Sequence, residues 1–232
     1  LQFNRDTMTE VALIDHNGEG EATANIQLCT AHWYGGNREQ SCENTVKSVK
    51  KLLGGIQIDG YYELNMSEIP KLNSMVDGVT VTLEDDFSKK YPKMKKGATI
   101  NLDDEQAYAY VHDRYGVGDE ENTSRMKRQQ QYMTGFFKKL QEKVKANPNY
   151  ANEVFESLQD VSTTDITIGK ISNISNIFAS GTDKGIFELA GKSKIGQALG
   201  DEIDHMEFYV NKKAMVSTMS ELFGIVEQKN KE

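Results

Sequence analysis

The stretch DDEQAYAYVHDRYGVGDEENTSRMKRQQQYMTGFFKKL, residues 103–140, decides how the fold is interpreted. It predicts a short helix, a charged loop and then a long amphipathic helix. Asp103 and Gln106 have the spacing of a capping box at the start of the short helix. The long helix has Asn122, Thr123 or Ser124 available as its cap. Its apolar residues recur mostly at three- and four-residue steps, which predicts one buried face: Met126, Met133, Phe136, Phe137, Leu140 and Val144.

Arginine side chains gather at the start of this long helix. At about 100° per residue, Arg125 and Gln129 project about 40° apart at the edge of the apolar face, with Arg128 just beyond them and nearer solvent. A guanidinium directed toward a core is costly unless an anion pairs with it. The helix dipole disfavours a cation in the first turn, where backbone N–H groups are also free. Together with Arg114 in the preceding loop, these donors predict a site for phosphate or pyrophosphate.

The alternative is that Arg125 and Arg128 are ordinary surface residues. Their long apolar stems would then lie along the helix while their charges pair with acidic residues of the preceding loop, Asp119, Glu120 or Glu121. This alternative predicts exposed guanidinium groups and no ligand.

Several motifs resemble one known family. YVHDR (110–114) followed by SRMKRQ (124–129) resembles the signature of the LytR-CpsA-Psr family, extracytoplasmic proteins of Gram-positive bacteria. That signature is a Tyr-Val-Arg-x-Arg stretch, an acidic loop and an Arg-x-x-Arg-Gln helix start. The resemblance covers roughly residues 3 to 140, because three further segments also match in order: NRDTMTEV (4–11), AHWYGG (31–36) and LLGGIQIDGYYELNMSEIPKLNSMVDGVTVTL (52–83).

The fold expected is α/β, because strands and helices alternate along the chain. The residue patterns predict strands at 7–15, 61–66, 79–83, 186–189 and 206–210, and helices at 43–53, 150–158, 165–178 and 212–223. With the resemblance, we expect a layered α-β-α domain with a central mixed sheet whose amino-terminal strands are truncated. Residues 1–232 would form a single domain, with 150–232 packed on the same sheet. A membrane anchor and the first strands would lie upstream.

The resemblance implies a phosphotransferase that passes a polyprenyl-pyrophosphate-linked glycopolymer to peptidoglycan. Neutralising the charge on phosphate oxygens is what such a reaction needs. Matched motif by motif, the catalytic residues would be Arg114, Arg125 and Gln129, and the substrate-binding residues Arg5, His112, Asp119, Asn122 and Arg128. A structural salt bridge is the alternative role for Arg5. A magnesium or manganese ion would bind Asp6, with its second ligand upstream of Leu1.

Departures from the family pattern support other functions. Asn4 stands where the family has an arginine, His112 replaces another arginine, and Asn122 replaces an acidic residue for which Asp119 could substitute. They favour a non-catalytic polyprenyl-phosphate-binding or regulatory module, in line with the family's description as transcriptional attenuators. A protein that shares only the fold is the third possibility.

The lipid of such a substrate needs an apolar groove. Seven residues could line it: Ile69, Leu72, Met75, Tyr132, Met133, Phe136 and Phe137. The alternative is ordinary core packing, because amphipathic helices usually bury such residues.

Composition excludes some classes of protein. The net charge of −8 argues against a nucleic-acid surface, and the one dense basic segment, KKYPKMKKG (89–97), is expected to be a solvated loop. No stretch has the roughly 20 apolar residues of a membrane span, and no signal peptide is present. Because the resemblance places the protein outside the cytoplasm, Cys29 and Cys42 are expected to form a disulfide.

Overall fold

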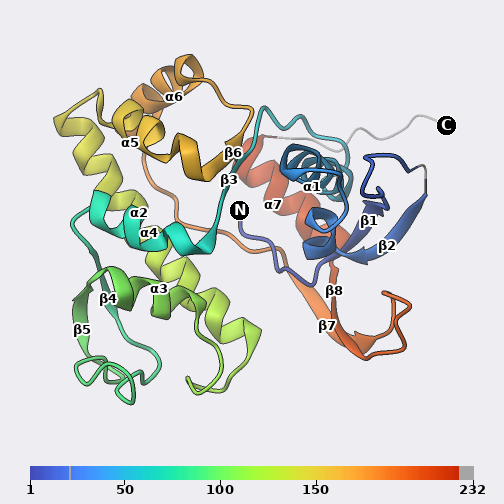
Figure 1. Ribbon diagram of the computed structural model, residues 1–232, viewed down its shortest axis with the longest axis horizontal. Coiled ribbons are helices and arrows are strands. Elements are labelled where there is room, and N and C mark those ends of the chain that lie inside the picture. The colour runs from blue at the N-terminus through green and yellow to red at the C-terminus, as the bar shows by residue number, and fades with distance from the viewer. Residues whose placement is uncertain (21, 225–232) are drawn as a thin grey trace. The chain divides into compact units, whose positions relative to one another are not determined.

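The computed structural model describes residues 1–20 and 22–224, and it divides the chain into two compact units (Figure 1). The first unit joins Leu1–Tyr61 to Phe187–Glu232, and the second is the continuous segment Tyr62–Ile186. Both units mix helices and strands, which confirms the α/β class. That the chain forms a single domain stays a prediction. No helix in the described part of the chain is both long enough and apolar enough to cross a bilayer.

The first unit begins with a strand pair covered by a helix. Strand β1 (Met8–Ala12) pairs antiparallel with β2 (Thr23–Gln27), which leads into the 3-10 helix η1 (Leu28–His32). Helix α1 (Arg38–Leu52) packs on β1. It begins before residue 43, where the sequence pattern placed it, because the Asn37 side chain accepts a hydrogen bond of 2.9 Å from the backbone N–H of Gln40.

The end of the chain completes this unit. Strands β7 (Gly191–Gly196) and β8 (His205–Val210) form an antiparallel hairpin, and helix α7 (Lys212–Phe223) follows. The predicted strand at 186–189 is only an isolated bridge between Gln2 and Glu188. A second, parallel bridge links β1 to β8, with the N–H of Phe208 donating to the carbonyl of Asp6 at 2.8 Å.

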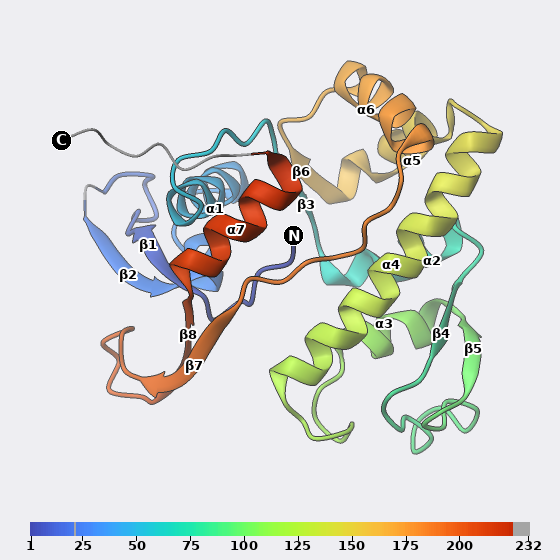
Figure 2. The same ribbon diagram turned by 180° about the vertical axis from the view of Figure 1, so that it is seen from behind.

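The second unit is organised along one long helix. Its elements in order are β3 (Tyr62–Leu64), η2 (Met66–Glu68), α2 (Ile69–Met75), β4 (Val79–Thr82), β5 (Thr99–Leu102), α3 (Asp104–His112), α4 (Asn122–Ala146), α5 (Tyr150–Leu158), η3 (Gln159–Val161), β6 (Ser162–Thr164) and α6 (Ile168–Ser180). Figure 2 shows α4 running the length of the unit, with α3 beside its first half and α5 and α6 beside its second half. The core lies where α2, α3 and α4 meet the β4–β5 hairpin.

The two helices of the 103–140 stretch start differently. The predicted capping box of α3 is confirmed, with Asp103 and Gln106 each bonding the other's backbone N–H. The prediction that Asn122, Thr123 or Ser124 caps α4 is wrong. The cap position is Glu121, whose side chain makes no capping hydrogen bond.

The sheets differ from the expected central mixed sheet. The described strands form four separate antiparallel pairs: β1–β2, β3–β6, β4–β5 and β7–β8. The strands have three to six residues, and pairs such as β1–β2 and β4–β5 pack on their own helices, α1 and α4. Mixed pairing is limited to the bridges with Glu188 and Phe208.

Candidate functional site

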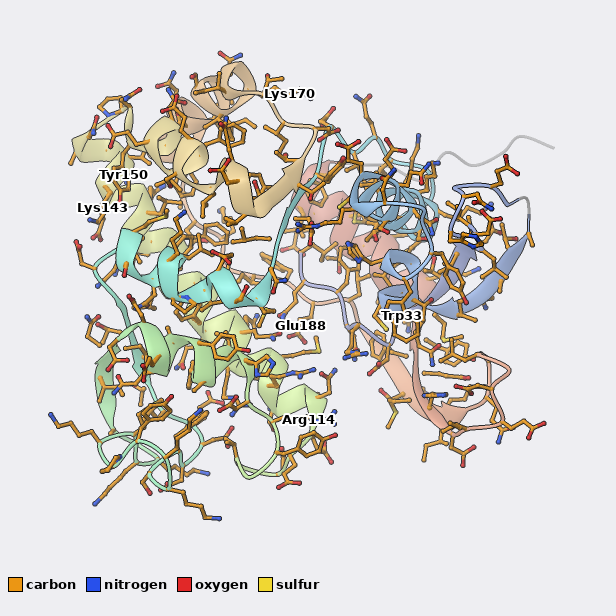
Figure 3. All side chains as sticks on the ribbon, viewed as in Figure 1. Trp33, Arg114, Lys143, Tyr150, Lys170 and Glu188 are labelled. Atoms are coloured by element: carbon orange, nitrogen blue, oxygen red, sulfur yellow. The ribbon has the colours of Figure 1, made fainter. Side chains whose placement is uncertain are left out.

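The start of α4 is tied to the end of α3. The Arg128 Nη2 donates a hydrogen bond of 2.6 Å to the carbonyl of Asp113, and the Gln129 Nε2 donates one of 3.0 Å to the carbonyl of Val111. These bonds hold the loop after α3 against the second turn of α4. Because Arg114 follows Asp113 directly, these bonds also keep Arg114 near this end of the helix (Figure 3). That Arg114 and Arg125 form one anion site stays a prediction.

The guanidinium of Arg114 forms no ion pair with a carboxylate in the described part of the chain. Its guanidinium carbon lies 4.4 Å from the centre of the Tyr115 ring, and its Nη2 donates to the Tyr115 hydroxyl. Its Nε is buried without a hydrogen-bond partner. A half-buried guanidinium in this state favours binding of an anion.

Arg125 projects from the first turn of α4. Its Nη2 donates a hydrogen bond of 2.7 Å to the Asn122 Oδ1. The Asn122 side chain therefore orients Arg125 and does not cap the helix. Arg125 is half-buried, so the exposed arrangement of the surface alternative does not hold for it.

Arg128 lies in the interior, and the prediction that it lies nearer solvent is wrong. Only 2% of it is exposed. Its Nη1 is 3.4 Å from the Asp85 Oδ2, and its guanidinium lies over the Phe87 ring at 5.1 Å. Burial lowers the pKa of Arg128, and the Asp85 carboxylate opposes that shift. Its ion-pair partner is thus Asp85, which helical spacing alone does not reveal.

Asp113 connects the loop to a further cation. Its Oδ1 lies 3.1 Å from the Nδ1 of His112, whose ring stacks on Tyr108 at 4.7 Å. Its Oδ2 lies 3.6 Å from the Lys90 Nζ. Lys90 belongs to the segment expected to be a solvated loop, and no local pattern indicates that it reaches this site.

The remaining site predictions in the second unit concern Asp119 and Gln129. Asp119 accepts hydrogen bonds from the Glu121 N–H at 2.9 Å and the Ser124 hydroxyl at 2.7 Å, and these lower its pKa. It therefore holds the start of α4. Gln129 uses its amide nitrogen on Val111, and its catalytic role stays a prediction.

Arg5 and Asp6 belong to the first unit, at the turn before β1. The Arg5 Nε lies 3.5 Å from the Asp6 Oδ1, so Arg5 forms the salt bridge given as its alternative role. The Asn4 Oδ1 accepts from the Asp6 N–H at 3.0 Å, which makes Asn4 a turn residue. Within residues 1–20 and 22–224, Asp6 belongs to no cluster of three His, Cys, Asp or Glu ligands. Asp6 offers one carboxylate, which is not a complete magnesium site.

The expected disulfide is absent, and both cysteines are thiols. Cys29 lies in η1, with its sulfur 3.7 Å from the Arg5 Nη2, and burial raises the pKa of its thiol. Cys42 is buried on α1. The prediction failed because it rested on the expected compartment and not on geometry.

An apolar pocket of about 290 Å³ lies in the second unit. Residues of β3, α2, α4, α5 and α6 line it: Tyr62, Leu72, Phe136, Phe137, Leu140, Ala151, Val154, Phe155, Leu158, Ile171, Ile174, Ser175 and Phe178. Of the seven groove residues predicted, Leu72, Phe136 and Phe137 line it. Ile69 and Tyr132 are buried in the core, Met133 packs against that core, and Met75 does not line the pocket. The sequence pattern missed the wall from α5 and α6, because their packing on α4 is tertiary.

Solved structures share this fold at low sequence identity. Protein gbs0355 from Streptococcus agalactiae matches with a TM-score of 0.71 and 19% identity, over 99% of this chain and 76% of that chain. B. subtilis TagV matches with a TM-score of 0.67 and 19% identity, over 96% and 82%. The structure described as TagT bound to LIIa-WTA matches with a TM-score of 0.63 and 19% identity, over 95% and 76%.

Among curated proteins, no significant match is found. The family model for LytR_cpsA_psr, by contrast, matches residues 1–223, which is nearly the whole chain. The protein therefore belongs to the LytR-CpsA-Psr family.

Proposed function

We propose that the chain is a cell-wall glycopolymer phosphotransferase domain, which transfers a polyprenyl-pyrophosphate-linked polymer to peptidoglycan. One observation carries the proposal: Arg114 is held at the start of α4 with a buried Nε that has no partner and no carboxylate to neutralise its charge. Family membership supports it, as does the likeness to a TagT structure that holds wall teichoic acid.

The chemistry assigned to the site is charge neutralisation. Arg114 and Arg125 would contact the non-bridging oxygens of the diphosphate, where charge is spread during phosphoryl transfer. The α4 cap residue Glu121 makes no side-chain capping bond, so N–H groups of the first turn can add to these donors. Arg128 would not contact the substrate. Its hydrogen bond to the Asp113 carbonyl would hold the neighbouring Arg114 in position.

A magnesium or manganese ion is part of the proposal. Asp6 would supply one carboxylate to this ion. Binding and orientation of the diphosphate would rest on the arginines of the second unit.

The prenyl chain would occupy the apolar pocket. Phe136, which lines the pocket, lies about 16 Å along α4 from Arg125 at 1.5 Å per residue. A longer prenyl chain should therefore bind better than a short one. A protein with this substrate would work outside the cytoplasm in a Gram-positive envelope, anchored to the membrane in its full-length form.

Calorimetry with farnesyl pyrophosphate, with and without magnesium, tests the anion site. Arg114→Ala should weaken binding roughly ten- to a hundredfold, because a charge-assisted hydrogen bond is lost. Lys127→Ala is the matched control, since it removes one exposed cation from the start of α4. Equal affinities of the two variants would contradict the proposed site. Release of polyprenyl phosphate in the presence of lipid-linked polymer and peptidoglycan then tests transfer.

The second candidate is a non-catalytic prenyl-phosphate-binding or regulatory module. Asn4 favours it, because this residue occupies the place of a family arginine and uses its side chain in a turn. Farnesyl pyrophosphate binding without any release of polyprenyl phosphate would support this candidate over the transferase.

A further inference from the structure

The segment between β4 and β5 carries a concentrated positive charge. Residues 89–97 contain five lysines and no acidic residue, although the whole chain has a net charge of −8. All five are exposed, and we call them the lysine loop: Lys89, Lys90, Lys93, Lys95 and Lys96.

The backbone of the lysine loop is ordered by packing and hydrogen bonds. Met94, at its centre, is fully buried in the core beside Phe87. Backbone hydrogen bonds close the turn, with the Met94 N–H donating to the Tyr91 carbonyl at 2.8 Å and the Phe87 N–H to the Met94 carbonyl at 2.9 Å. The backbone from which the lysine side chains project is therefore held in place.

Nearby acidic groups leave most of this charge unneutralised. Asp85 faces Arg128. Asp86 accepts hydrogen bonds from the N–H and hydroxyl of Ser88, and it also attracts Lys95 electrostatically. Lys90 pairs with Asp113. In the described part of the chain, the other four lysines of the loop form no ion pair with a carboxylate.

The lysine loop adjoins the anion site. The Lys90 Nζ lies 3.6 Å from the carboxylate of Asp113, the residue directly before Arg114. Figures 1 and 2 both show the β4–β5 and α3–α4 loops at the same end of the second unit. A polymer whose diphosphate binds at Arg114 would start beside these lysines.

We propose that the lysine loop binds phosphate groups of the polymer carried on the prenyl diphosphate. The inference rests on the proposed function and specifies its substrate class: a glycopolymer with phosphates in its backbone, and not a neutral polysaccharide. Exposed ammonium groups suit such a ligand, because they are mobile, strongly hydrated charges that need no fixed geometry. An anionic bilayer is less well matched, since residues 84–102 expose no large apolar side chain that could insert into it.

The test neutralises the four lysines of the loop that form no ion pair, leaving Lys90 with Asp113. K89Q/K93Q/K95Q/K96Q should bind lipid-free poly(glycerol phosphate) about tenfold more weakly than the native chain, with a smaller dependence on salt. Its affinity for farnesyl pyrophosphate should stay within about twofold, because the arginines are intact. The control K47Q/K50Q/K138Q/K192Q makes the same charge change at exposed lysines outside the loop and should leave both affinities unchanged.

Three outcomes would count against the lysine loop, and a fourth against the proposed function only. Unchanged polymer binding in the loop variant would overturn the inference, and an equal loss in the control would show a net-charge effect. If the loop variant instead loses binding only to phosphatidylglycerol vesicles, the loop faces a membrane and the inference is wrong. Failure of the native chain to bind farnesyl pyrophosphate, with polymer binding still dependent on the loop, would contradict the proposed function alone.

Discussion

Replacing Arg128 with alanine is expected to lower the free energy of unfolding by about 3 kcal/mol, because a buried ion pair is then broken on one side only. Arg128 is 2% exposed, and its partner Asp85 has 15% of its side chain exposed. The variant leaves the Asp85 carboxylate poorly solvated and removes the hydrogen bond to the Asp113 carbonyl. Urea unfolding followed by far-ultraviolet circular dichroism measures the loss.

A paired replacement separates the ion pair from simple loss of packing. Arg128→Met combined with Asp85→Leu removes both charges and should recover part of the stability, since neither partner remains uncompensated. Lys127→Ala, on the exposed side of the same turn, should change stability by less than about 0.5 kcal/mol. If Arg128→Ala is as stable as the Lys127 variant, Arg128 does not hold the loop after α3.

Asn73→Ala is expected to cost about 3 kcal/mol, because one buried amide satisfies groups from several elements of the second unit. Asn73, at 1% exposure, accepts from the Val79 N–H at 3.1 Å and from the Tyr132 hydroxyl at 3.3 Å. It donates to the Leu102 carbonyl at 3.0 Å and to Asp104 at 2.9 Å. The alanine would leave buried backbone groups of β4 and β5 without partners.

The same unfolding experiment checks this prediction. Asn176→Ala, at an exposed position of α6, is the matched control and should be nearly neutral. A loss below about 1 kcal/mol for Asn73→Ala would mean that water or a neighbour replaces the amide, and that Asn73 does not join α2 to the β4–β5 hairpin.

Local patterns predicted the helices best. The capping box of Asp103 and the apolar spacing in α4 are short-range features, and α5 and α7 occur at the predicted residues. Strand pairing was harder to predict from the sequence. Strand β5 is only Thr99–Leu102, and its register is set by β4 across a long loop. No single segment contains that information.

The site was predictable where residues are close in sequence. The sequence predicts that Arg114 and Arg125 meet at the start of α4, and the bonds from α4 hold Asp113, the neighbour of Arg114, at this position. The anion site itself stays a prediction. The burial of Arg128 and the approach of Lys90 depend on Asp85 and Asp113, which come from other segments. Ion pairs between distant segments produce no periodic pattern in the sequence. The two pairs, Arg128–Asp85 and Lys90–Asp113, are therefore visible only in the folded structure.

The division of the chain into units also orders its assembly. Residues 62–186 are contiguous, so every segment of that unit is available once they have been synthesised. The other unit needs segments from both sides of residues 62–186, since a bridge joins Thr7, directly before β1, to Phe208 in β8. A ribosome must therefore synthesise the chain through Phe208 before that unit can close, and until then the edge of the β1–β2 pair that faces β8 is unpaired.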